Sequence, residues 1–256
     1  MASYRSLVPL DPSIISSYGE KPMFHLAGGQ ACADVAAALL ALVQELPWLR
    51  VTDCFREVSV QVALRKRYDT WVAAGKPKAG SAGWNAKTMK DAFVAIPGKS
   101  MHNAGRAVDL NTEVMQKNLG KEYLDAFWPI ATKHGFSHII AKPTEGASES
   151  WHYDHHGDWD RVFSHLGYEQ GALCAALDVG QAGAFQSDAA LVQALLLRAG
   201  YDIGAVDGQL GKRSYTALAM ALAPGRYPPD GKVTDQVIED LRALPPLVTG
   251  DWKVVS

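Results

Sequence analysis

Residues 100–109 read SMHNAGRAVD, and residues 149–156 read ESWHYDHH. Together they form the region of the chain in which metal-binding residue types come in a usable order. Catalytic zinc usually takes three protein ligands from His, Asp and Glu and leaves one position for water, whose pKa the metal lowers to about 7. A carboxylate that is not a ligand can then act as a general base. The two stretches supply each of these parts.

Three side chains of these stretches are the predicted ligands: His102, Asp109 and His152. Gly105 would let the chain turn tightly between the first two ligands. Glu149 is the predicted free carboxylate. Because Glu149 and His152 are three residues apart, they would face opposite sides of a regular strand. The segment must therefore bend or bulge if both are to face one metal ion.

The pattern Ser-x-His-x-x-Gly-x-Ala-x-Asp, followed by Glu-x-Trp-His, resembles the zinc D-alanyl-D-alanine carboxypeptidases of the vancomycin-resistance (VanY) type and the related phage L-alanyl-D-glutamate endopeptidases. The resemblance implies the same three zinc ligands, with Glu149 as the catalytic base. Upstream, DCFR at residues 53–56, followed by Gln61, resembles the arginine segment of that family, with Phe55 in place of the usual tyrosine. The resemblance implies that Arg56 holds the substrate carbonyl and stabilises the developing oxyanion.

Other polar and aromatic side chains near the motifs also have predicted roles. Three are predicted to contact substrate: Ser100, Gln61 and Trp151. A turn role is the alternative for Ser100, and a place in the pocket wall or the core for Trp151. His155 or His156 could replace a ligand, and this alternative stays open. Asp154 could orient a ligand histidine from behind.

A second motif lies near the C-terminus, where residues 192–201 read VQALLLRAGY and residues 207–218 read DGQLGKRSYTAL. Two amphipathic helices flanking a tight Asp-Gly-x-x-Gly turn resemble the small three-helix peptidoglycan-binding domain that accompanies many cell-wall hydrolases. Ser214 stands where that domain usually has threonine. Asp207 and Gly208 are expected to shape the turn rather than to touch a ligand.

These patterns predict an α+β fold in two domains. A zinc peptidase domain, with helices packed on a small antiparallel sheet, would span residues 1–177, and a linker at 178–186 would lead to a small three-helix domain at 187–256. Helices are expected at 32–46, 59–74, 122–134, 189–199, 212–222 and 234–243, and strands at 49–55, 107–110, 136–140 and 150–153. Residues 75–98 are expected to form a surface excursion with a short helix around 88–94, and long loops of this kind are often lids or binding loops.

Composition excludes several classes of protein. The chain has 256 residues, with 25 Lys and Arg against 27 Asp and Glu, so its net charge of −2 gives no global basic field for nucleic acid. Its three cysteines form no C-x-x-C pair and are expected to be free and buried. No apolar run approaches the roughly 20 residues that span a bilayer, so membrane insertion is not expected.

Together the two motifs predict a zinc-dependent, monomeric peptidoglycan hydrolase that cuts an amide of the stem peptide, with the C-terminal domain raising its local concentration on the polymer. The cleaved bond could be L-Ala-D-Glu or D-Ala-D-Ala, by endopeptidase or carboxypeptidase action. No secretory signal is evident. This favours a phage or prophage endolysin made in the cytoplasm and released to the wall through a holin. A secretion-system effector, a non-catalytic wall-binding protein and a zinc enzyme for a small substrate are the alternatives.

Overall fold

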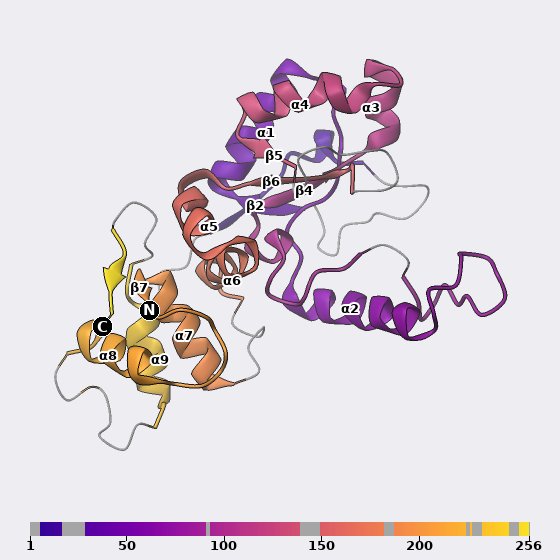
Figure 1. Cartoon of the computed structure of the whole chain (residues 1–256). Helices are drawn as coiled ribbons and strands as arrows, with labels where there is room; N and C mark the ends of the chain where they lie inside the picture. The colour runs from indigo at the N-terminus through magenta and orange to yellow at the C-terminus, as the bar shows by residue number, and fades with distance from the viewer. Residues whose placement is uncertain are drawn as a thin grey trace.

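The computed structural model describes residues 6–16, 29–90, 93–138, 149–181, 187–223, 226, 232–245 and 251–255. Helices and small antiparallel sheets combine as the predicted α+β class requires (Figure 1).

A four-stranded antiparallel sheet forms the centre of the peptidase part. Its strands lie in the order β3 (Val51–Asp53), β4 (Ala107–Leu110), β6 (His152–His155) and β5 (Phe136–Ser137). The register places Asp109 opposite His152 across β4 and β6, and opposite Asp53 across β4 and β3. The sheet thus brings residues from three distant parts of the sequence to one point.

One side of this sheet is covered by three helices, α1 (Ala33–Glu45), α3 (Thr112–Leu119) and α4 (Tyr123–Lys133) (Figure 1). Leu39 of α1 and Phe127 of α4 are fully buried in the same core as Val108 of β4. Beside α1 lies a two-stranded antiparallel sheet of β1 (Leu7–Pro9) and β2 (Gln30–Cys32), with a short 3-10 helix, η1 (Pro12–Ile14), after β1. The apolar faces of these elements hold the sheet in place.

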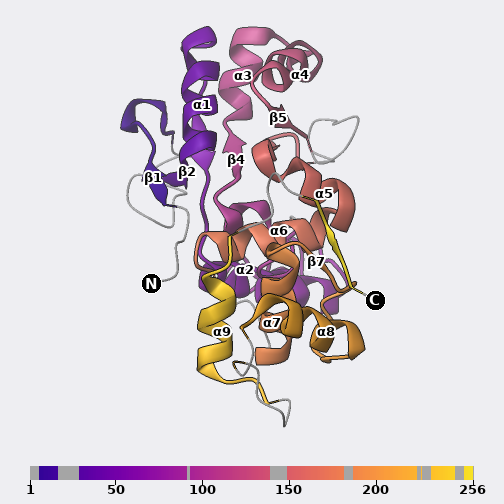
Figure 2. The same ribbon diagram turned by 90° about the vertical axis from the view of Figure 1, so that its left-hand side faces the viewer.

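Further helices surround the end of the sheet where the two motifs meet. They are α2 (Val58–Ala73), the 3-10 helices η2 (Met101–Ala104) and η3 (Gly157–Trp159), α5 (Asp160–Leu166) and α6 (Tyr168–Asp178). Every residue of α6 from Gly171 to Asp178 is buried. Figure 2 shows α6 between the layer that contains the sheet and the C-terminal helices. One core cluster runs from Met101 of η2 through α6 to Val255.

The C-terminal part contains α7 (Asp188–Arg198), α8 (Lys212–Ala221) and α9 (Asp235–Arg242), with a parallel pair of two-residue strands, β7 (Tyr201–Asp202) and β8 (Lys253–Val254). The Ser187 hydroxyl caps α7 and the Thr234 hydroxyl caps α9 by accepting a backbone N–H bond. All three predicted helices are confirmed to within two residues at each end. The division into two domains stays a prediction.

Some expectations need correction. The short helix around 88–94 is wrong, because the described residues on both sides of 91–92 are not helical. The strand expected at 150–153 begins at His152 instead, since residues 150–151 form a turn. Residues 139–140 of the expected strand and 182–186 of the expected linker lie outside the described residues.

Two expectations from composition can be compared directly with the structure. Cys32, Cys54 and Cys174 are all free and buried, as predicted. None of the helices in the described part of the chain combines the length and the hydrophobicity that crossing a bilayer requires.

Candidate metal centre and active site

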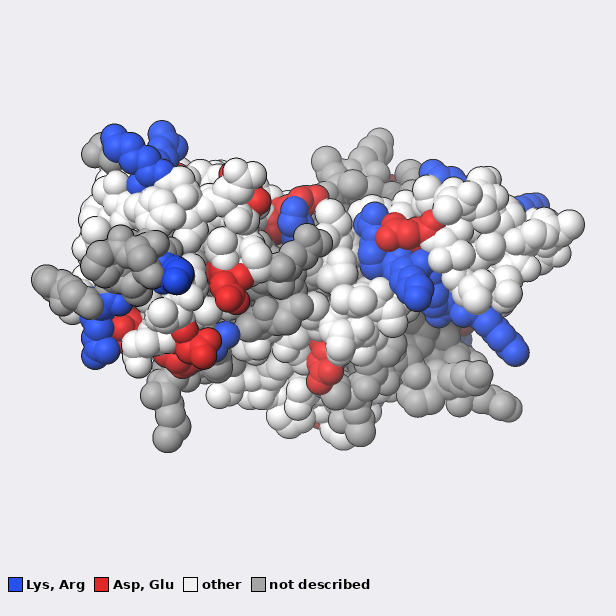
Figure 3. Space-filling view, turned by 90° about the horizontal axis from the view of Figure 1, so that it is seen from below, with Lys and Arg blue, Asp and Glu red and all other residues white. Residues whose placement is uncertain are grey.

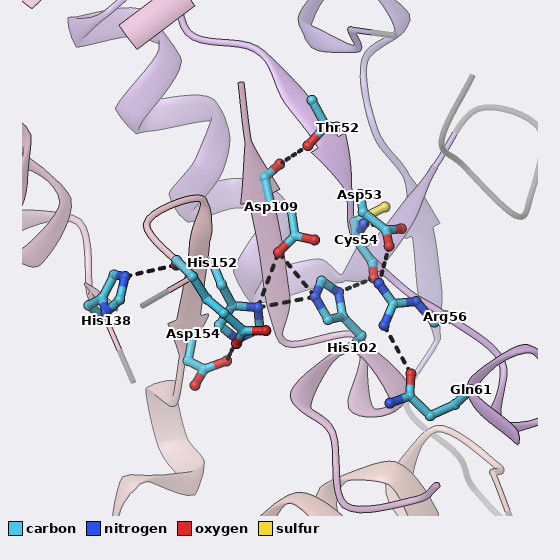
Figure 4. A network of polar contacts seen from close by, with 11 residues as sticks. Thr52, Asp53, Cys54, Arg56, Gln61, His102, Asp109, His138, His152 and Asp154 are labelled. Atoms are coloured by element: carbon cyan, nitrogen blue, oxygen red, sulfur yellow. Dashed lines mark hydrogen bonds and ion pairs between the residues drawn. The ribbon is translucent and has the colours of Figure 1, made fainter. Parts of the chain in front are cut away.

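The three predicted ligands meet at one point (Figure 4). His102 Nε2 lies 3.2 Å and His152 Nδ1 lies 3.1 Å from Asp109 Oδ1, and the two ring nitrogens are 3.1 Å apart. All three side chains are buried. Among the residues that the structure describes, this is the group of His, Cys, Asp and Glu side chains placed to hold a metal ion.

Local structure explains how the ligands reach this point. His102 lies in η2, which ends at Gly105 with a φ of 64°, a left-handed conformation that glycine adopts without steric cost. The chain turns there and enters β4, which carries Asp109. His152 is the first residue of β6 and faces Asp109 across the sheet. The tight turn predicted at Gly105 is therefore confirmed.

Both imidazoles are oriented by a second hydrogen bond. His102 Nδ1 lies 2.6 Å from the carbonyl oxygen of Cys54, and His152 Nε2 lies 2.9 Å from Asp154 Oδ1. Each of these nitrogens faces an acceptor and so carries the proton, which leaves the other nitrogen free as a ligand. Asp154 thus contacts a predicted ligand from behind, as the sequence suggested.

The chemistry of the donor set fits zinc. Two imidazole nitrogens and one carboxylate oxygen form the three-ligand set typical of catalytic zinc. Burial acts to raise the pKa of Asp109, but the nearby His102 and His152 outweigh burial and hold the pKa well below its ordinary value. Asp109 is therefore a carboxylate, the form in which it binds a metal.

Glu149 lies at the same site because the backbone bends in front of β6. Its φ is 49°, a left-handed conformation that is uncommon outside glycine, and the His152 N–H donates to the Glu149 carbonyl oxygen at 2.9 Å. This turn is the bend that the three-residue spacing required. Burial raises the pKa of the Glu149 carboxyl group.

Two side chains hold Arg56 in place at the site. It forms an ion pair with Asp53, and its Nη1 donates to Gln61 Oε1 at 2.9 Å. The Gln61 Nε2 in turn donates to the carbonyl oxygen of Ala95 at 2.9 Å. Both ends of the Gln61 amide are therefore hydrogen-bonded within the protein. One bond holds the Arg56 guanidinium, and the other joins α2 to the predicted excursion at residues 75–98.

A cavity of about 110 Å³ brings these groups together. Its wall includes all eight predicted site residues: Arg56, Gln61, Ser100, His102, Asp109, Glu149, Trp151 and His152. The predicted excursion supplies more of the wall through Lys90, Phe93, Val94 and Ala95. The remaining lining residue is Tyr168 of α6.

Sequence reasoning missed Tyr168. Its hydroxyl hydrogen-bonds the carboxylate of Asp154 and accepts from the backbone N–H of Met101, and burial is the main cause that raises its pKa. Tyr168 therefore extends the chain of contacts behind His152. No sequence motif identified Tyr168, because its hydrogen-bond partner Asp154 lies in a different element, β6.

The structure also shows where the two alternative metal ligands, His155 and His156, lie. The His155 ring packs edge-on against Phe136, with ring centroids 5.2 Å apart, and the His156 ring stacks on Phe163 at 4.3 Å. Neither histidine belongs to the group that could hold a metal ion.

Comparison with known proteins agrees with this geometry. The VanY family model, described as D-alanyl-D-alanine carboxypeptidase, matches residues 30–158, which is half of the chain. The protein is therefore a zinc metallopeptidase. It belongs to the VanY family of D-alanyl-D-alanine carboxypeptidases.

Two solved structures are similar to the chain. One is a zinc-bound variant of the vancomycin-resistance D,D-pentapeptidase VanY, with 19% identity over 62% of this chain and 89% of that chain, and a TM-score of 0.33. The other is the D,D-dipeptidase VanXYg with a phosphinate analogue of D-Ala-D-Ala, with 19% identity over 70% of each chain and a TM-score of 0.36. Among curated proteins, none matches this chain.

Proposed function

We propose that the protein hydrolyses a D-alanyl amide bond in the stem peptide of peptidoglycan, with His102, Asp109 and His152 as zinc ligands. The convergence of these three side chains with Glu149 in one cavity carries the proposal. The family match favours the D-Ala-D-Ala bond over the L-Ala-D-Glu bond.

The chain's own residues divide the reaction between them. Zinc at this site would supply Lewis-acid polarisation and an activated water at neutral pH. Glu149 takes the proton from the attacking water and later delivers it to the leaving amine. Arg56 donates to the oxygen that gains negative charge as the amide carbon becomes tetrahedral. Asp53 and Gln61 hold the Arg56 guanidinium in place for that task.

The lining of the cavity suits small side chains. Apolar walls from Phe93 and Val94 suit methyl groups, and Ser100 supplies a hydroxyl group for a hydrogen bond. A D-alanyl residue, which has a methyl side chain, meets both conditions.

The C-terminal helices are the second part of the proposal. We propose that residues 187–256 form a peptidoglycan-binding domain that holds the enzyme on the polymer. The buried Gln193 side chain supports the predicted turn, because its Oε1 accepts from the N–H groups of Asp207 and Gly208 at 3.1 and 2.8 Å. A wall-binding domain beside this peptidase favours an endolysin, and a secretion-system effector would use the same chemistry.

Product analysis tests the function and identifies the bond. Purified sacculi and a soluble pentapeptide ending in D-Ala-D-Ala are incubated with the zinc-loaded protein, with and without a chelator, and the products are identified by mass spectrometry. Loss of one terminal D-alanine indicates a carboxypeptidase, and separated cross-links indicate a D,D-endopeptidase. Cleavage between L-Ala and D-Glu indicates an L-alanyl-D-glutamate endopeptidase. The absence of any chelator-sensitive product, or cleavage only between L-Ala and D-Glu, would contradict the proposal.

Glu149→Gln tests the assigned base. We expect turnover to fall by about 10²- to 10⁴-fold, the usual contribution of a general acid-base group, while zinc stays bound. Glu113→Gln on α3, an exposed change of the same kind, serves as the matched control and should keep full turnover. An active Glu149→Gln variant would show that another group carries the proton.

A further inference from the structure

Charge is distributed unevenly along the chain. Residues 58–99, which comprise α2 and the excursion, contain eight Lys or Arg and two Asp or Glu. Their net charge is +6 in a chain whose total is −2, so the rest of the chain carries −8. We call residues 58–99 the basic arm. Figure 3 shows Lys and Arg side chains gathered in a band over α2 on the face seen from below.

The arginines and a tryptophan of the basic arm hold its two parts together. Arg65 Nη1 donates to the carbonyl oxygen of Val94 at 2.8 Å, and Arg67 Nη2 donates to that of Ala86 at 2.8 Å. Trp71 Nε1 makes a third hydrogen bond into the excursion, at 3.0 Å. The excursion is thus fastened along α2, which gives the positive charges a defined arrangement.

Three lysines of the basic arm are available to a partner. Lys66, Lys78 and Lys87 are exposed, and none has an ion pair among the described residues. Asp69, the acidic residue of α2, already pairs with Arg65 at 2.9 Å. Uncompensated like charges on one surface create a field that attracts anions and raises their local concentration.

The basic arm also borders the active site. The same segment that carries the lysines supplies Lys90, Phe93 and Val94 to the wall of the catalytic cavity. An anionic polymer that lies along the arm is therefore held beside the reacting groups.

We propose that the exposed lysines of the basic arm bind free carboxylates of peptidoglycan strands next to the cleaved bond. This inference rests on the proposed function and identifies a second contact with the same substrate. Stem peptides carry free carboxylates at regular intervals along the polymer, so several lysines spread over one face can engage several stems at once. A short peptide that fills the catalytic cavity alone does not need this contact.

A charge-reversal variant tests the proposal. Lys66→Glu, Lys78→Glu and Lys87→Glu together reverse the charge of these three exposed lysines without touching the catalytic wall. The matched control combines Lys117→Glu, Lys121→Glu and Lys133→Glu, which are exposed lysines outside the arm and outside residues 187–256. Both triple variants change the net charge by the same amount, so only the position of the charge differs.

Binding is measured by co-sedimentation with purified sacculi that carry no phosphate polymer. We expect the arm variant to bind at least about tenfold more weakly than the control at about 0.1 M salt, and we expect this difference to disappear near 1 M, where screening shortens electrostatic interactions to about 3 Å. Sacculi whose carboxyl groups have been amidated should bind the wild type as weakly as the arm variant. Equal binding by both variants, or full binding to amidated sacculi, would overturn the proposal.

Two further measurements distinguish this proposal from a failure of the proposed function and from binding to nucleic acid. Turnover of a soluble substrate, either the short D-Ala-D-Ala peptide or a cross-linked stem-peptide dimer, should be the same in the wild type and both variants, and no turnover of either substrate in any of them would refute the proposed function instead. Binding of duplex DNA is measured at the same salt concentration, and a loss of DNA binding in the arm variant with no loss of binding to sacculi would overturn the carboxylate assignment in favour of nucleic acid.

Discussion

Glu149 connects the geometry of a single residue to the pH dependence of the enzyme. The proposed base acts as a carboxylate, and burial raises its pKa above the ordinary value of 4.5. As the pH falls through the raised pKa, the base becomes protonated and activity is lost. The acidic limb of kcat/KM should therefore lie above pH 4.5. A profile measured at saturating zinc, with metal content checked at each pH, tests this, and a limb at or below 4.5 would contradict it.

Tyr168 and Asp154 provide a test of metal affinity. Asp154→Asn weakens the acceptor behind His152 and should raise the zinc dissociation constant by about 10- to 100-fold, as is usual for such partners. Tyr168→Phe removes only the hydroxyl group that bonds Asp154, so we expect a smaller change in the same direction. Competition with a chromogenic chelator measures both constants.

Tyr215→Phe is the matched control for this pair of variants, since Tyr215 of α8 is 38% exposed, as is Tyr168. Its zinc affinity should equal that of the wild type. Unchanged affinity in Tyr168→Phe and Asp154→Asn alike would show that these side chains do not hold His152.

Local spacing carries much, but not all, of the information about single residues. His102, Asp109 and His152 could be assigned from the sequence because each lies in a short motif, and the structure places them together. The three-residue spacing between Glu149 and His152 required a bend in the chain, but the sequence could not give the backbone conformation of Glu149 that makes this bend. Tyr168 could not be assigned, because its role depends on the packing of α6 against η2 and on no neighbour in the sequence.

At the scale of elements, the turn between η2 and β4 depends on Gly105. A Cβ atom there would lie 2.5 Å from Leu7 Cδ2 and 3.3 Å from the Cys32 backbone nitrogen, in addition to the strain of a positive φ. Gly105→Ala should cost about 1–3 kcal/mol from strain alone, with the steric contact adding to it. Gly75→Ala is the control, because its φ is 78° but nothing lies within 4 Å. Denaturant unfolding compares the two, and an equal loss would exclude the contact.

Two of the predicted helices, α7 and α9, have features that the unpredicted helix α6 lacks. The predicted α7 and α9 begin at capping hydroxyl groups and have leucine or valine at helical spacing. Helix α6 has no polar face, because all residues from Gly171 to Asp178 are buried, so periodicity could not reveal it. The helix expected around 88–94 does not form. Instead, Arg67 Nη2 donates hydrogen bonds to the carbonyl oxygens of Ala86 and Met89.

At the scale of the whole molecule, a buried ion pair joins α6 to α7. Arg198 and Asp178 lie 2.8 Å apart, and their side chains are only 3% and 2% exposed. Arg198→Met removes the Arg198 charge from beside the buried Asp178 carboxylate and should lower the free energy of unfolding by about 3–5 kcal/mol. The control is Arg161→Met, whose exposed pair with Asp251 should be worth no more than about 1 kcal/mol. Similar losses in the two variants would contradict a central role for the buried pair.

The order of the parts along the chain could be predicted, but their packing could not. The motifs place a zinc peptidase before a set of three helices, and both appear in that order. The core cluster that runs from Met101 to Val255 joins side chains more than a hundred residues apart, and no local pattern encodes such a pairing. The basic arm was hidden by a net charge near zero, because its +6 is balanced by acidic residues elsewhere.

X-ray absorption at the zinc edge tests the ligand set most directly. For the protein loaded with one zinc ion per chain, we predict a four-coordinate site with two imidazole nitrogens at about 2.0–2.1 Å, oxygen in the remaining positions and no sulfur. His152→Ala should lose one imidazole contribution. Sulfur ligands, or a wild-type spectrum with no imidazole scattering, would contradict the assignment of His102, Asp109 and His152 as the metal site.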